Sequence, residues 1–167
     1  MKTKAFFITT MMFVFLLIYL TGIHAQTAKS NIDQVKLMSQ ALGTWEATVD
    51  KDTVIVRDYQ EYGKAYTVNV YYIVKGKKTP YYISNYCIDS KEGKFKGFIL
   101  YADGRYGTWI GLWTSDKKIS IDAVQNFNPE IVAFKVEYVY DTPKSVIETR
   151  FSATGVKILE RKFKKVK

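Results

Sequence analysis

The stretch "ALGTWEATVD", residues Ala41 to Asp50, marks the point where the hydrophobic period of the chain changes. Before it, residues 30–43 repeat apolar side chains at helical spacing, and Ser30 with Asp33 fits a capping box. Gly43 is expected to end this helix, because the residue after a helix often takes a positive φ. From Gly43 onward the apolar period is two, which is typical of β-strands.

Ten candidate strands follow, separated by glycine, proline, asparagine and aspartate at turn positions. They span residues 44–49, 53–62, 65–74, 80–88, 94–102, 106–113, 118–125, 131–140, 145–152 and 156–166. Their short connections favour antiparallel hairpins, because parallel neighbours need long crossovers. So many strands exceed what an open twisted sheet usually carries. The sequence therefore predicts an all-β fold, a ten-stranded antiparallel up-and-down barrel with one short N-terminal helix.

A helix followed by Gly43-Thr44-Trp45 at the start of a meander barrel resembles the pattern of the lipocalins and the calycin superfamily. The stretch "IDSKEGKFKGFILYADGRYGTWIGLW" also resembles bacterial secreted lipocalin-like domains of unknown function. In that family the tryptophan closes the barrel floor and an arginine lies across it. The resemblance implies that Gly43 and Trp45 build the floor with Arg161, or with Arg150 as second choice. It extends from about Ala41 to the end of the chain.

The N-terminus has the features of a secretory signal peptide over residues 1–25. Two lysines precede an apolar run that ends in a small residue, Ala25. The protein is then expected to be periplasmic or extracellular after cleavage near Ala25, with a lead and helix over 26–42 and the barrel over 43–167. An uncleaved membrane anchor is the alternative, because the run is nearly long enough to span a bilayer.

Composition narrows the chemistry that the mature chain can perform. The 167 residues carry a formal charge of +9 and contain one histidine and one cysteine. Cleavage removes His24, which excludes catalytic triads and sites that bind zinc or haem through histidine, so no metal or cofactor is expected. Cys87 has no intramolecular disulfide partner and is expected to be a small buried side chain.

Two aromatic strands supply candidate ligand-binding residues. Trp109, Gly111 and Trp113 share one face of a strand. Either the indoles line a cavity in which Gly111 leaves room for a ligand, or they fill the core and Gly111 lets the strand bend. Asn69 and Tyr71 share one face of the strand over 65–74, and the period alone does not tell whether that face points inward.

Charged residues supply further candidates. Glu148 and Arg150 share a strand face, so they form either an internal pair in which Arg150 fixes a carboxylate or phosphate, or a solvated cross-strand pair. The C-terminal run "RKFKKVK" either makes weak contact with an anionic surface or protects an edge strand. No recognition helix or basic-aromatic motif suggests a nucleic-acid partner.

These features together predict an exported binding protein for a small apolar or amphipathic ligand, without catalytic activity. Two alternatives stand beside it. One is a metal-free barrel enzyme of the cyclase or isomerase type, and the other is an envelope interaction protein with a filled core. The oligomeric state does not follow from the sequence.

Overall fold

The computed structural model describes residues 32–167, so the predicted signal peptide lies outside the described residues. The described part begins with helix α2 (Gln34–Met38), which continues as a 3₁₀ turn, η1 (Ser39–Ala41). The carboxylate of Asp33 caps this helix by accepting a hydrogen bond from the Lys36 backbone N–H at 3.0 Å. The helix is therefore shorter than predicted and has Asp33 as its N-cap. Within residues 32–167, no helix is long and apolar enough to cross a membrane.

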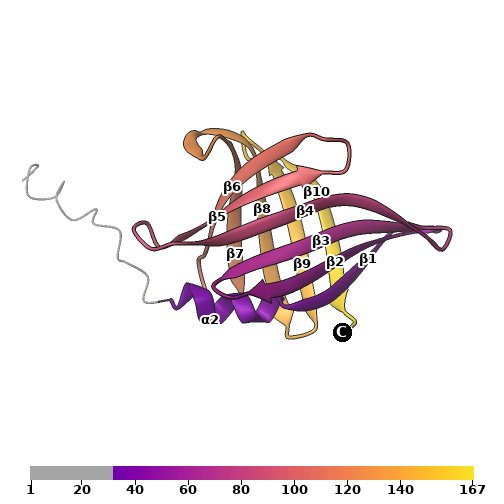
Figure 1. Ribbon diagram of the computed structural model, residues 1–167. Coiled ribbons are helices and arrows are strands. Elements are labelled where there is room, and N and C mark those ends of the chain that lie inside the picture. The colour runs from indigo at the N-terminus through magenta and orange to yellow at the C-terminus, as the bar shows by residue number, and fades with distance from the viewer. Residues whose placement is uncertain (1–31) are drawn as a thin grey trace, which may run out of the picture. The chain divides into compact units, whose positions relative to one another are not determined.

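Ten strands follow the helix, and each pairs antiparallel with its neighbours in sequence (Figure 1). Their bounds are β1 (Gly43–Asp50), β2 (Thr53–Tyr62), β3 (Ala65–Val74), β4 (Lys77–Asp89), β5 (Lys94–Tyr101), β6 (Tyr106–Trp113), β7 (Lys118–Gln125), β8 (Asn128–Thr142), β9 (Ser145–Ser152) and β10 (Lys157–Lys165). β10 pairs back onto β1, which closes the barrel. The predicted all-β meander barrel with one short helix is confirmed, and it is compatible with a lipocalin-like fold.

The strands β4 and β8 begin three residues earlier than the sequence predicts, so Pro80 lies inside a strand rather than at its first position, and Pro129 lies in a strand rather than in the preceding turn. Pro80 is opposite Tyr71 at a bulge in the β3–β4 register. Proline is tolerated at a bulge, since its missing N–H leaves no gap in a regular ladder. The bounds of β2, β3, β6, β7 and β9 agree with the predicted ones.

The pleat decides which side chains enter the barrel. On β3, Val68 and Val70 are buried inside the barrel, so Asn69 and Tyr71, which alternate with them, point outward. On β4, Tyr86 is buried and the next residue, Cys87, is exposed, which corrects the expectation of a buried cysteine. Residues 161–165 of the C-terminal basic run lie in β10, which pairs with β9 and, at Lys164 and Lys165, with β1, so the run does not protect a free edge.

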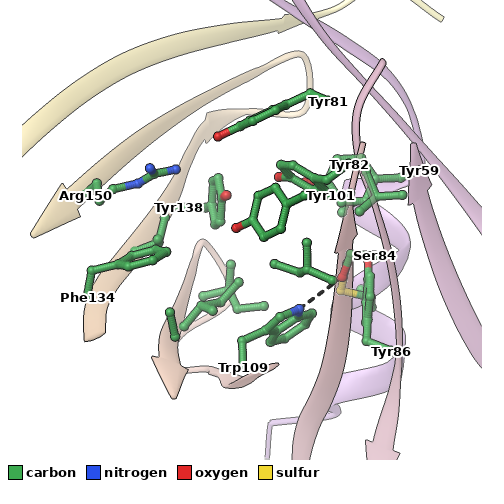
Figure 2. A pocket seen from close by; sticks show the side chains of 18 of the residues that line it. Tyr59, Tyr81, Tyr82, Ser84, Tyr86, Tyr101, Trp109, Phe134, Tyr138 and Arg150 are labelled. Atoms are coloured by element: carbon green, nitrogen blue, oxygen red, sulfur yellow. Dashed lines mark hydrogen bonds between the residues drawn. The ribbon is translucent and has the colours of Figure 1, made fainter. Parts of the chain in front are cut away.

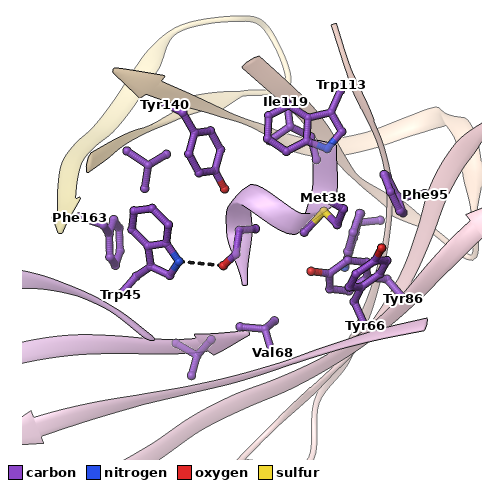
Figure 3. Packing of buried hydrophobic residues seen from close by; sticks show 14 of the residues in the cluster. Met38, Trp45, Tyr66, Val68, Tyr86, Phe95, Trp113, Ile119, Tyr140 and Phe163 are labelled. Carbon is purple, nitrogen blue, oxygen red and sulfur yellow. Dashed lines mark hydrogen bonds between the residues drawn. The ribbon is translucent and has the colours of Figure 1, made fainter. Parts of the chain in front are cut away.

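One end of the barrel is closed by the helix and Trp45. The Trp45 indole is 1% exposed, and its Nε1 donates to the Ala41 carbonyl at 2.7 Å. Tyr140 packs edge-on against it with ring centroids 5.7 Å apart (Figure 3). Gly43 has φ of +100°, and a Cβ there would overlap the Lys167 carbonyl, so only glycine lets the chain enter β1 this close to the C-terminus.

The helix is held to the barrel wall by a buried amide. Gln34 Nε2 donates to the Trp113 carbonyl at 3.0 Å, and the Trp113 backbone N–H donates to Gln34 Oε1 at 2.6 Å. Met38 and Ala41 then point into the barrel and are buried. Helix α2 and the 3₁₀ turn η1 therefore form the floor of the barrel interior.

We expect Trp45→Ala to lower the free energy of unfolding by about 3–5 kcal/mol, because it removes a large, fully packed ring and a buried hydrogen bond. Urea unfolding followed by circular dichroism measures the loss. Tyr106→Ala, at a ring that is 63% exposed, is the control and should change stability little. A loss for Trp45→Ala as small as the control's would contradict its role in the floor.

Candidate functional site

The barrel encloses a cavity of about 100 Å³, and Met38 and Ala41 of the helical segment form part of its lining. Part of its lining is aliphatic and consists of Met38, Ala41, Val68, Ile99, Ile119 and Ile121. The polar part of the lining carries phenol and serine hydroxyls and one guanidinium, from Tyr59, Tyr81, Tyr82, Ser84, Tyr86, Tyr101, Tyr138, Tyr140 and Arg150 (Figure 2). Among the described residues that line the cavity, Arg150 is the only charged one. The cavity therefore combines an aliphatic surface with a polar surface that carries one cation.

Trp109 lines this cavity, and two neighbours hold its indole in place. The indole Nε1 donates to Ser84 Oγ at 3.1 Å. A Cβ on Gly97 would overlap the indole ring, so glycine at this position of β5 lets the ring lie flat against the strand. The indole is therefore a fixed wall of the cavity.

The two other aromatic-strand candidates do not widen the cavity. Trp113 is fully buried in the core, 5.3 Å from the Tyr140 ring, and is not among the lining residues. A Cβ on Gly111 would lie 3.0 Å from Ile121 Cγ1, so Gly111 packs tightly and leaves no room for a ligand. Of the two predicted roles for the indoles, Trp109 therefore lines the cavity and Trp113 fills the core.

A buried ion pair lies next to the cavity. Arg57 donates to Glu148 Oε2 at 2.7 Å, and both side chains are almost completely buried. Arg150 approaches the other carboxylate oxygen at 3.4 Å, and Arg161 lies opposite Glu148 in the β9–β10 register. The solvated alternative for Glu148 and Arg150 is therefore wrong, since Glu148 is inside the barrel and its closest partner is Arg57.

The protonation states in this region are fixed at neutral pH. Burial alone would raise the pKa of Glu148, but Arg57 and Arg150 outweigh it and hold the pKa below the usual value. Burial raises the pKa of Tyr82 and Tyr138, and the opposing effect of Arg57 is smaller. Glu148 therefore stays ionised, and these phenols stay neutral hydrogen-bonding groups.

Positive charge exceeds negative charge around the cavity. Among the described residues, the three arginines Arg57, Arg150 and Arg161 surround the carboxylate of Glu148. The Nε atoms of Arg57 and Arg150 are buried and have no hydrogen-bond partner. A guanidinium with an unused donor at a cavity wall is suited to an anionic group such as a carboxylate.

The remaining predicted site residues lie elsewhere. Asn69 and Tyr71 line a separate groove on the outer wall of the barrel, where Lys78 Nζ lies 3.8 Å from the Tyr71 ring centroid. At the floor, Lys165 Nζ lies 5.3 Å from a ring centroid of Trp45 and Arg57 is opposite Trp45 in the β1–β2 register, whereas Arg161 is opposite Glu148. The structure thus brings Trp109 and Arg150 to one cavity and leaves Asn69, Tyr71 and Arg161 out of its lining.

Arg57 and the phenols of Tyr59 and Tyr138 are the functional candidates that sequence reasoning missed. The sequence did contain a usable signal. Arg57 is two residues after Ile55 on β2, and Glu148 is two residues after Val146 on β9, so each charged residue shares a strand face with a buried apolar one. Opposite charges at apolar alternating positions of two strands indicate a buried pair.

Comparison with known proteins adds no functional assignment. No protein-family model matches the chain, and a search of curated proteins finds no match either. Within residues 32–167, no three histidine, cysteine, aspartate or glutamate side chains gather where they could hold a metal ion. The geometry of the cavity is therefore the basis for a functional proposal.

We expect Glu148→Leu to destabilise the protein by about 3–5 kcal/mol, because it leaves the Arg57 guanidinium buried without its counter-charge. The double variant Arg57→Leu, Glu148→Leu should regain most of this loss, since it removes both charges. Urea unfolding of the four proteins in the cycle measures the coupling. Additive losses from the two single variants would contradict a coupled buried pair.

Proposed function

We propose that this chain is an exported lipocalin-like binding protein of the calycin superfamily and that its barrel holds one small amphipathic acid. The observation that carries the proposal is Arg150, the one charged side chain in the described cavity lining, with an unused buried donor. An acid group would complete its hydrogen bonding, while the apolar part of the ligand would contact Trp109 and the aliphatic floor.

The size of the cavity limits the ligand. An apolar cavity of about 150 Å³ binds a benzene molecule, whereas ordinary drug-sized pockets enclose roughly 300–1,000 Å³. The cavity in this barrel, at about 100 Å³, is smaller than that benzene site, so it admits at most a single ring and excludes a long acyl chain. The aromatic lining of Trp109, Phe134 and the tyrosines also favours a ring, because aromatic faces and edges attract one another.

Two features support binding over the alternative functions. A metal-free acid–base enzyme needs a group that gains and loses a proton near neutral pH. The interior phenols have raised pKa values and Glu148 has a lowered one, so these groups hold one protonation state there. The free volume inside the barrel also favours a ligand over a filled core.

Calorimetric titration with benzoate, phenylacetate and phenylpropionate tests the proposal, because these acids place the carboxylate at three distances from one ring. We expect at least one to bind saturably, and its uncharged alcohol and its amine counterpart to bind at least about tenfold more weakly. Binding should change the fluorescence of Trp109, and Trp109→Phe should remove most of this response.

Arg150→Met should weaken acid binding by about tenfold or more and leave the alcohol unaffected. Arg161→Met is the matched control, because it removes the same charge from the neighbouring strand outside the cavity lining. The proposal fails if none of the acids binds, or if the amine binds as tightly as the acid.

A further inference from the structure

The cavity has a second polar region beside Trp109, across the cavity from Arg150 (Figure 2). It consists of two inward side chains of β4, Ser84 and Tyr86, which are 2% and 5% exposed. Ser84 Oγ accepts the hydrogen bond from the indole of Trp109, and the Tyr86 ring centroid lies 5.0 Å from that of Trp109. Both residues line the cavity.

The hydroxyls of this region have hydrogen-bonding capacity that the protein does not use. Tyr86 Oη is buried and has no hydrogen-bond partner. Ser84 uses its oxygen to accept from Trp109, so its own proton remains available for donation. A buried hydroxyl without a partner is unfavourable, and native proteins keep few of them away from functional sites.

The side chains around Tyr86 favour an uncharged ligand group as its hydrogen-bond partner. Its ring stacks on Tyr66 at 5.5 Å and meets the edge of Phe95 at 6.0 Å, so aromatic groups surround it. No charged side chain is among the described lining residues on this side of the cavity, since Arg150 lies across from it. A charged ligand group would be desolvated here without a counter-charge, which is far more costly than burying a hydrogen-bonded neutral group.

We infer that Ser84 and Tyr86 form a second ligand subsite, which binds a neutral oxygen or nitrogen substituent on the ring end remote from the acid. The inference rests on the proposed function, because it assumes that a ring acid is oriented by Arg150. It narrows the ligand class to ring acids that also carry a phenol, carbonyl, amide or similar group. Such a ligand bridges the cavity between two polar ends with its ring against Trp109.

The test compares the para-hydroxy and para-methyl derivatives of benzoate, phenylacetate and phenylpropionate by calorimetry. Hydroxyl and methyl groups are close in size, so a difference between them reports hydrogen bonding rather than fit. For the spacer length that binds best, we expect the hydroxy acid to bind about fivefold more tightly than the methyl acid. Equal affinity of the two for the unaltered protein would overturn the inference.

Tyr86→Phe is the informative variant, because it deletes a hydroxyl that makes no hydrogen bond in the protein and should fold normally. It should abolish the preference for the hydroxy acid and leave the methyl acid unchanged. Tyr66→Phe is the matched control, since Tyr66 stacks on Tyr86 but is not among the cavity-lining residues. A preference that survives Tyr86→Phe would also overturn the inference.

The two proposals fail in different ways. If the unsubstituted and methyl acids bind but the hydroxy acids gain nothing, the subsite inference is wrong and the proposed function stands. If no ring acid of any kind binds, the proposed function is wrong and the subsite falls with it. Tighter binding of the hydroxy acids that requires Tyr86 supports both.

Discussion

The pairing of β1 with β10 is the constraint on which the rest of the structure depends. The Thr44 N–H donates to the Lys167 carbonyl at 3.0 Å, and the Val166 N–H donates to the Thr44 carbonyl at 2.8 Å. In an open sheet of the same order, β2 and β9 would lie near opposite ends. Closure leaves only β1 and β10 between them, so Arg57 reaches across the Phe163 ring to Glu148. The buried ion pair and the enclosed cavity are both consequences of this seam.

The interior combines two kinds of polar group that close packing alone would not select. Among the described residues, three arginines surround the carboxylate of Glu148, and several phenols stay neutral because burial raises their pKa. Unpartnered buried atoms at Arg150 and Tyr86 reduce the stability of the folded protein, and each such atom calls for a physical explanation. Arg150 and Tyr86 lie on two sides of one cavity that Trp109 also lines, so the cavity favours one orientation of a ligand with two different polar ends. A ligand that satisfies both would also stabilise the folded state by mass action.

Local rules were sufficient for the fold but not for the site. Alternation and turn residues predict the bounds of strands such as β2 and β6, because these signals act over a few residues. The same rules miss the bulge at Pro80 and leave the inward face of β3 open, since both depend on cross-strand register. Residue type and strand position are enough to select Trp109 and Arg150 as candidates. The Arg57–Glu148 contact joins positions 91 residues apart, which only barrel closure brings together. The roles of Gly97 and Ser84 depend on where the Trp109 indole lies, which no local pattern reports.

Amide hydrogen exchange at the seam, measured by NMR on the folded protein, tests barrel closure most directly. If β1 and β10 are paired as described, the Thr44 and Val166 amides exchange measurably more slowly than unpaired amides, although the short seam opens more readily than the longer β3–β4 ladder. Exchange of both amides at the rate of an unpaired edge strand, while β3 and β4 remain protected, would show an open sheet. The enclosed cavity and the ligand proposals would then have no structural basis.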